Sequence, residues 1–183
     1  TSDVTLYPVW EINSYKVMFI CGEDVVNPPS EITLDYGSTI PPQNATKTGF
    51  RLNGWSTKED GSELYDFSTP VTGPVALYPV WVKTCTITYI CGEDVLDAPE
   101  GITVDINTVV EAPEEPSKTG YTFKGWKASL DSKDFFSFGS ITSDVTLYPV
   151  WEINSYKVTF VYGEDVDFSS SEISVDHGTT IPP

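Results

Sequence analysis

Apolar and polar side chains alternate with a period of two through several short stretches of the chain, a pattern typical of strands with one buried face. Val17, Phe19 and Cys21 share a face of one such stretch, and Ile87 and Tyr89 hold the same places in a later one. Irregular chain with a single helical turn is expected before the strand that contains Leu-Tyr-Pro-Val-Trp. Further strands are predicted at Val4–Trp10, Ile32–Asp35, Phe50–Trp55, Ile102–Asp105, Tyr121–Trp126, Val158–Tyr162 and Ile173–Asp176.

The strands recur because the chain is a tandem array. The sequence Leu-Tyr-Pro-Val-Trp occurs at Leu6–Trp10, Leu77–Trp81 and Leu147–Trp151, with steps of 71 and 70 positions between the tryptophans. Thr1–Val17 is also identical to Thr142–Val158. A fixed period of this kind indicates repeated structural units. The expected division is residues 1–14 as the closing strand of a preceding repeat plus a link, 15–84 and 85–155 as two repeats, and 156–183 as the opening part of a further repeat.

The Leu-Tyr-Pro-Val-Trp segment is interpreted as the closing strand of each repeat, with Leu and Trp in the core and Tyr and Val facing outward. Its proline lacks an N–H donor, so the strand is expected at a sheet edge or with that position turned outward. A second hypothesis has Leu6–Trp10 open a repeat by pairing with Val17–Cys21. The predicted structural core is Trp10, Phe19, Trp55, Trp81, Tyr89, Trp126, Trp151 and Phe160, and the possible interaction face is Tyr7, Val9, Tyr78, Val80, Tyr148 and Val150.

Charge excludes two classes of partner. The chain has 10 Lys+Arg against 27 Asp+Glu and a formal net charge of −17, so nucleic acid and anionic membrane surfaces would be repelled. No apolar run approaches the roughly 20 residues of a membrane span. A unit of about 70 residues buries little surface, and the five tryptophans supply the large rings that compensate for this.

Little in the sequence indicates catalysis or a cofactor. His177 is the only histidine, and Cys21, Cys85 and Cys91 form no Cys-x-x-Cys pair, so free thiols and no cofactor are expected. Carboxylates recur in pairs at the Gly-Glu-Asp turns, where a solvated turn is the first interpretation and calcium the second. The weak calcium candidates are Glu23, Asp24, Glu93, Asp94, Glu164 and Asp165.

Two motifs together resemble a known family. Gly-Tyr-x-Phe-x-Gly-Trp at Gly120–Trp126 and Thr-Leu-Tyr-x-x-Trp at Thr146–Trp151, at this spacing, resemble the Listeria–Bacteroides repeat of bacterial surface proteins. The resemblance implies a β-rich α+β fold, with tandem β-grasp-like (ubiquitin- or SUMO-like) modules of about 70 residues in an extended array. The chain departs from the family in having Pro-Val where Ala-Lys is usual, and Gly-Glu-Asp at the opening turn.

The leading hypothesis is a non-enzymatic, extracellular segment that acts as a stalk or spacer of a bacterial cell-surface protein. Its partners would then be the neighbouring repeats of the same chain. The alternative is an adhesive module that binds a host protein or a glycan, or that packs laterally or longitudinally in a surface filament. An exposed row of Tyr and Val would favour this second hypothesis.

Overall fold

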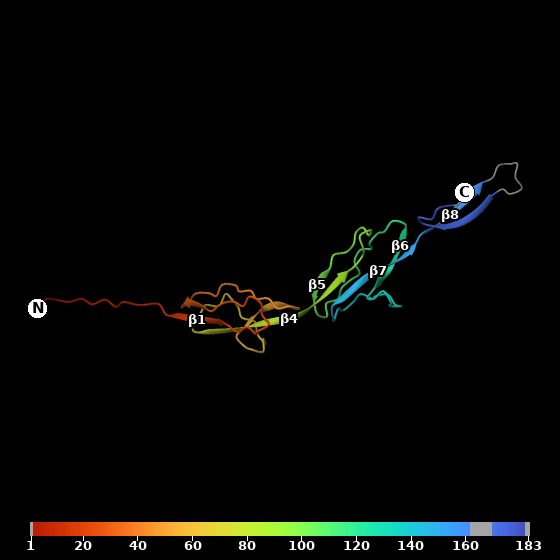
Figure 1. Ribbon diagram of the computed structural model, residues 1–183. Coiled ribbons are helices and arrows are strands. Elements are labelled where there is room, and N and C mark those ends of the chain that lie inside the picture. Colours follow the sequence, from red (N-terminus) through yellow and green to blue (C-terminus); the bar gives the residue numbers. More distant parts are fainter. Residues whose placement is uncertain (1, 162–169, 182–183) are drawn as a thin grey trace. The chain divides into compact units, whose positions relative to one another are not determined.

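The computed structural model describes residues 2–161 and 170–181, and the chain divides into two units after Thr84. The described residues form nine strands and no helix (Figure 1). The helical turn expected before each closing strand is therefore wrong, because residues 65–67 and 136–138 lie in irregular chain. The strands are β1 (Ser14–Phe19), β2 (Ile32–Asp35), β3 (Phe50–Ser56), β4 (Val75–Tyr89), β5 (Ile102–Asp105), β6 (Tyr121–Lys127), β7 (Val145–Ile153), β8 (Ser155–Val161) and β9 (Ser170–Asp176).

The first unit is a mixed four-stranded sheet in the order β2-β1-β4-β3. β1 and β2 form an antiparallel hairpin, in which Ser14 faces Asp35 and Val17 faces Ile32. The first three residues of β4 then pair with β1 in parallel, and β3 pairs with β4 antiparallel. The alternation in the sequence selects this arrangement, because it places Val17 and Leu77, both 0 % exposed, on one side of the sheet.

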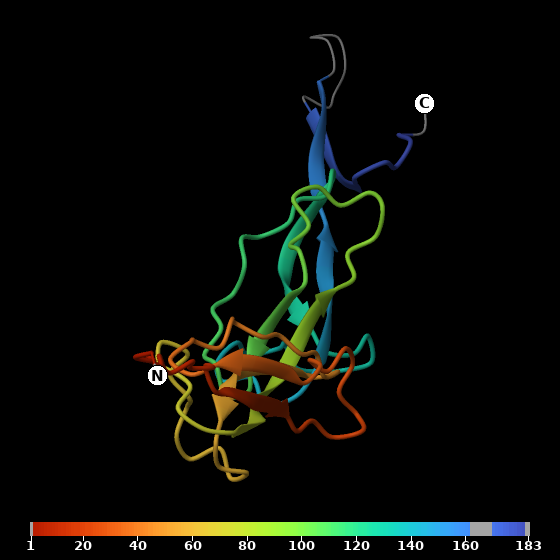
Figure 2. The same ribbon diagram turned by 90° about the vertical axis from the view of Figure 1, so that its left-hand side faces the viewer.

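The second unit repeats this arrangement. The last residues of β4 take the place of β1: they pair with β5 and, in parallel, with β7, while β6 pairs antiparallel with β7. The turned view of Figure 2 lets the reader follow β6 and β7 side by side. β8 and β9 form a separate antiparallel hairpin. Val82–Thr84, next to the boundary expected between the two repeats, continue strand β4.

Irregular chain covers the buried face of each sheet. In the first unit, Val25, Ile40, Ala45 and Val71 pack with Trp55 and the buried strand residues, although none of these four lies in a strand. Prolines at 41, 42, 70 and 74 make helix unfavourable in these segments, because proline lacks the donor and clashes with the preceding turn. Hydrogen bonds between the segment that follows β2 and the segment that precedes β4 satisfy the backbone instead. An example is Val71 N–H to Ser38 O at 2.7 Å.

At its proline the closing strand has one sheet neighbour, as expected for a position at a sheet edge. β4 pairs with β1 over Val75–Leu77 and with β3 over Tyr78–Lys83. β7 pairs with β4 over Val145–Leu147 and with β6 over Tyr148–Ile153. The prolines are compatible with this because each lies beyond the last parallel pair, which is Phe19 with Leu77 in the first unit. At Pro79 only β3 remains as a neighbour, through the pair with Trp55. A missing N–H at this position therefore leaves no ladder bond unmade.

Residues 2–13 form no strand, so the strand predicted at Val4–Trp10 is wrong. Trp10 is 87 % exposed, which contradicts its assignment to the core. In each repeat the closing strand is covered by an antiparallel neighbour from the preceding part of the same repeat, and no described segment does this for Trp10. Pairing of Leu6–Trp10 with Val17–Cys21 is also wrong, because β1 pairs with β2 and β4.

Two kinds of glycine fix the backbone where the sequence indicates. In the turns that follow β2 and β9, Gly37 and Gly178 have positive φ of 86° and 77°, and Asn107 takes the same place after β5 with a φ of 67°. The second kind lies in β3 and β6, where the register shifts at Gly54 and Gly125. At Gly125, with φ of 139°, an added Cβ would lie 2.9 Å from the Phe135 ring. The bulge therefore brings the backbone against a side chain of the following loop.

Candidate functional site

A groove in the second repeat is the clearest candidate for a binding site among the described residues. Its floor is aromatic, and its wall combines Leu96 with the segment before β6. We call it the aromatic groove; its lining residues are Leu96, Glu115, Pro116, Ser117, Lys118, Thr119, Tyr121, Phe123 and Trp151. All of them lie in the second unit of the chain, so the site belongs to a single repeat.

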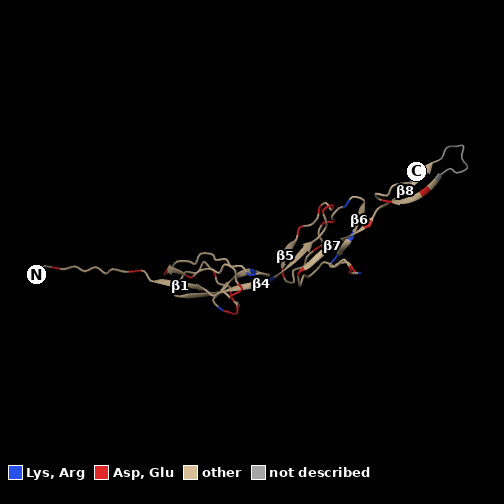
Figure 3. Ribbon diagram, in the orientation of Figure 1, with Lys and Arg blue, Asp and Glu red and all other residues tan. Residues whose placement is uncertain are grey.

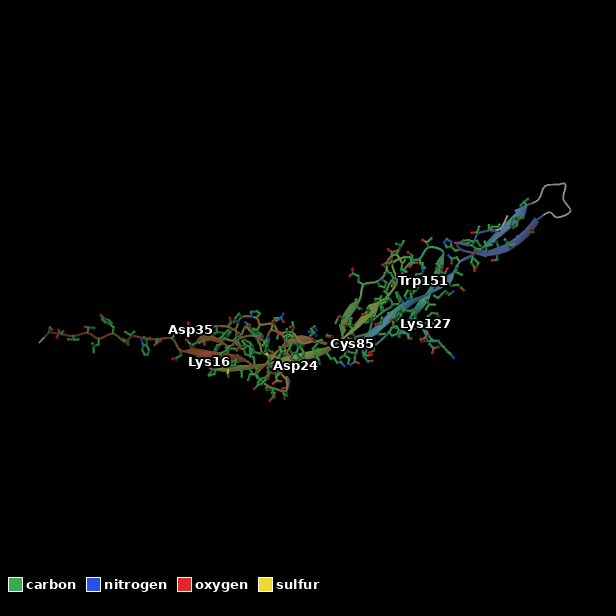
Figure 4. The ribbon with its side chains drawn as sticks, in the orientation of Figure 1. Lys16, Asp24, Asp35, Cys85, Lys127 and Trp151 are labelled. Carbon is green, nitrogen blue, oxygen red and sulfur yellow. The ribbon has the colours of Figure 1, made fainter. Side chains whose placement is uncertain are left out.

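The pairing register of β6 with β7 determines which aromatic residues form the floor of the groove. Phe123 of β6 lies opposite Trp151 of β7, and their ring centroids are 5.5 Å apart in an edge-on arrangement. Phe123 also contacts the buried Trp126, with centroids 5.3 Å apart. Such edge-to-face contacts are the preferred geometry for aromatic pairs. The floor is therefore held by the core, while the rings of Tyr121, Phe123 and Trp151 remain partly exposed. Figure 4 labels Trp151.

A lysine fixes the wall of the groove. Lys118 Nζ lies 2.8 Å from Asp94 Oδ2 and 4.7 Å from the centroid of the Tyr121 ring. Leu96 and Ser117 exchange backbone hydrogen bonds of 2.8 and 3.0 Å, which attach the turn after β4 to the segment before β6. Lys118 thus connects the acidic turn, the wall and the first residue of β6. We call the Asp94–Lys118–Tyr121 set the lysine clamp.

The first repeat has the same clamp but a different floor. Lys47 Nζ lies 2.7 Å from Asp24 Oδ2 and 4.6 Å from the centroid of the Phe50 ring. Leu52 faces Trp81 in the register that Phe123 and Trp151 occupy in the second repeat. The clamp is therefore common to both repeats, whereas the double aromatic floor is particular to the second.

The lysine clamp perturbs ionisation in a direction that can be tested. The hydrogen bond from Lys118 lowers the pKa of Asp94, and the hydrogen bond to Asp94 raises the pKa of Lys118. A lowered carboxyl pKa adds stability above its unfolded value, and this stability is lost as the pH falls through the folded pKa. A raised lysine pKa adds stability below its unfolded value, and this stability is lost as the pH rises through the folded pKa.

We expect Asp94→Asn to lower the melting temperature slightly at neutral pH, because the Asp94 side chain is largely exposed. The difference from the parent chain should be constant between about pH 5 and pH 9, and should shrink below about pH 4 and above about pH 10.5. Thermal melts by circular dichroism across this range measure it. Glu93→Gln, at an exposed neighbour, is the control. A melting-temperature difference that grew on acidification would contradict the assigned pairing.

The calcium candidates are not brought together in the structure. Lys47 and Lys118 already pair with Asp24 and Asp94. Asp35 accepts a hydrogen bond from Ser14 Oγ at 2.6 Å, at the other end of the β1–β2 hairpin, and Figure 4 shows Asp24 and Asp35 toward opposite ends of the first unit. Within residues 2–161 and 170–181 no group of three or more His, Cys, Asp or Glu could hold a metal ion. Glu164 and Asp165 lie outside the described residues. Calcium binding stays a prediction of the sequence alone.

The predicted core and face residues differ in burial. Trp55 and Trp126 are 1 % and 3 % exposed, and the Trp55 indole N–H donates to Gln43 O at 3.1 Å. The remaining core predictions in the two complete repeats and the last hairpin are half-buried: Phe19, Trp81, Tyr89, Trp151 and Phe160.

The possible interaction face is open only in residues 2–13. Tyr7 and Val9 are 82 % and 96 % exposed there. In the two repeats, Tyr78, Val80, Tyr148 and Val150 are half-buried. The loop after β3 approaches Val80, whose methyl groups lie 3.2–3.3 Å from where a Cβ on Gly61 would stand. The face is therefore partly covered by the repeat's own loop.

The three cysteines are free thiols in the structure. Cys85 is 1 % exposed in the core of the second unit, and burial raises the pKa of Cys21 and Cys91. A raised pKa reduces the thiolate fraction at neutral pH and hence reactivity.

Sequence reasoning missed both the lysine clamp and the groove. The recurrence of Lys-Thr-Gly at Lys47 and Lys118 was a usable signal for the clamp, since both lysines precede a strand by the same number of residues. The groove depends on the approach of Leu96 to Ser117, which no local pattern indicates.

Comparison with known proteins identifies the repeat. The sequence profile of the Listeria–Bacteroides repeat domain matches residues 15–80 and 86–150. A putative Gly-rich membrane protein of Evansella cellulosilytica is 33 % identical over 87 % of this chain, and a putative membrane protein of the same organism is 31 % identical over 97 %. Internalin H of Listeria monocytogenes is 28 % identical over 86 %.

The chain spans 19 %, 27 % and 28 % of the lengths of these relatives. Among the described residues no helix is long and apolar enough to cross a membrane. The two profile matches lie one on each side of the division between the two units of the structure, which follows Thr84. With two matches that together cover more than half of its residues, this chain belongs to the Listeria–Bacteroides repeat domain family.

Proposed function

We propose that the chain is a non-enzymatic spacer in an extracellular protein of the bacterial cell surface. Its relatives include two proteins named as membrane proteins and an internalin, and this supports a place at the cell envelope. The described residues offer no cluster for a metal, and the only histidine is an exposed turn residue. Its partners would be the neighbouring repeats of the same chain.

We further propose that each repeat is a β-grasp-like unit, at residues 15–84 and 85–155, with 1–14 and 156–183 belonging to adjoining repeats. The order β2-β1-β4-β3, with an antiparallel hairpin first and a closing strand parallel to it, supports this assignment. The irregular, proline-containing segments over the sheet would take the place of the helix.

One observation carries the spacer proposal. Strand β4 runs from Val75 to Tyr89 and serves as the closing strand of one repeat and the opening strand of the next. A shared strand provides no Gly/Ser tether between repeats, and such tethers are what make linkers flexible. Repeats joined in this way would transmit extension along the chain. In an array of this kind, stability is the sum of each repeat and its neighbour contacts.

Force spectroscopy on the chain, held at its two ends, tests the spacer proposal. Each repeat should unfold in its own step, with a contour-length gain of about 230–250 Å for about 70 residues, less the folded length of the repeat. Two steps of equal size are expected. A single step that released both repeats together would contradict a string of separate load-transmitting units.

The aromatic groove favours adhesion as a second function. A partly exposed aromatic floor with a polar wall is the composition of many ligand sites. The partner would be a host protein or a glycan, and packing in a surface filament is a third use of the same exposed surface. Binding of the labelled chain to host cells separates adhesion from spacing. A pure spacer would show no saturable binding.

A further inference from the structure

We propose that the aromatic groove of the second repeat binds a pyranose ring of an uncharged glycan. This inference rests on adhesion as the second function and names the class of ligand. The groove differs from the flat outer face considered in the sequence, because its floor is made by Phe123 and Trp151 and its wall by a separate segment of the chain.

The floor suits the apolar side of a sugar. The faces of aromatic rings carry negative charge, and the C–H groups of a pyranose are weakly positive, so the two pack face to face. Tyr121, Phe123 and Trp151 line one groove and are each partly exposed. The sheet register fixes the positions of all three residues, and Phe123 also contacts the buried Trp126, so little freedom is lost when a ligand binds.

The wall supplies the polar contacts that hydroxyl groups need. Glu115, Ser117 and Thr119 line the groove, and all three are exposed. A carboxylate accepts hydrogen bonds from sugar hydroxyls, and serine and threonine hydroxyls both donate and accept. This mixture matches a ring with hydroxyls around its edge and C–H groups on its faces. A purely apolar peptide side chain would offer those polar groups no hydrogen-bond partner.

Charge decides against anionic glycans. The segments 94–97 and 111–119 carry Asp94, Asp97, Glu111, Glu114 and Glu115, and the acidic residues are shown in red in Figure 3. Lys118 is the one lysine in these segments, and Asp94 already pairs with it. With a net charge of −17 on the whole chain, a sulfated or sialylated sugar would be repelled.

The first repeat supplies a natural control. There Leu52 faces Trp81 in place of Phe123 facing Trp151, and Asn44 replaces Glu115 at the same distance before the clamp lysine. Leucine is thus accommodated beside a tryptophan in this fold. Phe123→Leu should remove part of the floor and leave the repeat folded, and Glu115→Ala changes an exposed wall residue only.

Saturation-transfer NMR on the 183-residue chain tests the proposal with cellobiose, mannobiose and N,N′-diacetylchitobiose as neutral probes, and with a heparin disaccharide and sialyllactose as anionic ones. At least one neutral probe should bind through its ring protons, and neither anionic probe should bind. Phe123→Leu and Glu115→Ala should each weaken binding by about threefold to tenfold, as the loss of one aromatic or polar contact predicts. Asn44→Ala, in the first repeat, should leave it unchanged.

The proposal is overturned if no neutral probe binds, if an anionic probe binds better, or if binding survives both variants unchanged. Amide spectra show whether each variant is folded, and Glu115→Ala decides the matter if Phe123→Leu is not. Adhesion has a separate readout. If the chain binds cells equally well with Phe123→Leu, adhesion stands and the groove assignment fails. If the chain binds sugar but does not bind cells, the groove assignment stands and adhesion fails.

Discussion

Trp55→Ala is expected to destabilise the first repeat by about 3–5 kcal/mol, because it removes a large buried ring and leaves a cavity. Trp55 is 1 % exposed, contacts Phe19 at a centroid distance of 5.1 Å, and anchors the irregular chain through its hydrogen bond to Gln43 O. A unit of about 70 residues has only a few kcal/mol in reserve. The variant should therefore leave the first repeat largely unfolded at room temperature.

Amide spectra measure this result repeat by repeat. Signals of the first repeat should collapse to unfolded positions, while those of β6 and β7 stay in place. Trp10→Ala is the matched control, because Trp10 is 87 % exposed and its loss should change stability by less than about 0.5 kcal/mol. If Trp55→Ala melted like the parent, Trp55 would not be a core residue.

The second large effect is expected at the closing strand. Leu147 is 0 % exposed and lies opposite Tyr89 in the parallel pair, so Leu147→Ala should cost about 2–5 kcal/mol. Leu6 has the same neighbours in sequence, since Thr1–Val17 repeats Thr142–Val158, yet it is 87 % exposed. Leu6→Ala should therefore be nearly neutral. Urea titration followed by circular dichroism measures both variants.

This comparison separates local sequence from tertiary context, because the substituted residue and its flanking residues are the same in both variants. Equal losses of unfolding free energy at Leu6 and Leu147 would show that residues 2–13 are packed in solution. A neutral result at Leu147 would contradict the parallel β4–β7 pairing that buries it.

The strands were predictable because their signal is local. Val17 and Ile87 alternate with polar neighbours, and a period of two reports a strand with one buried face wherever it lies in the fold. The positive φ at Gly37 and Asn107 followed in the same way from the residue types that tolerate it. The family was also within reach, because Gly120–Trp126 and Thr146–Trp151 keep their spacing.

Strand neighbours were not predictable in the same way. Pro79 indicated a position with one sheet neighbour, and β3 alone pairs with it, because the pairing with β1 ends at Leu77. The proline does not indicate which strands supply these pairs. Trp10 shows the same limit. Its sequence context equals that of Trp151, and only the presence of β6 beside Trp151 makes one half-buried and the other exposed.

The groove was beyond sequence reasoning for a related reason. Phe123 and Trp151 were each assigned to a strand, but their contact depends on the antiparallel register of β6 with β7. The wall depends on Leu96 meeting Ser117, two residues in irregular chain. Contacts between irregular segments carry no period, so they appear only once the fold is known.

Small-angle X-ray scattering of the chain tests the spacer proposal most directly. A compact domain of this length has a radius of gyration of about 16 Å. An extended array predicts a clearly larger radius and a pair-distance distribution with a long tail, and these should be independent of protein concentration. A radius near that of the compact domain, with a symmetric pair-distance distribution, would mean that the two repeats are buried against each other and would contradict the proposal.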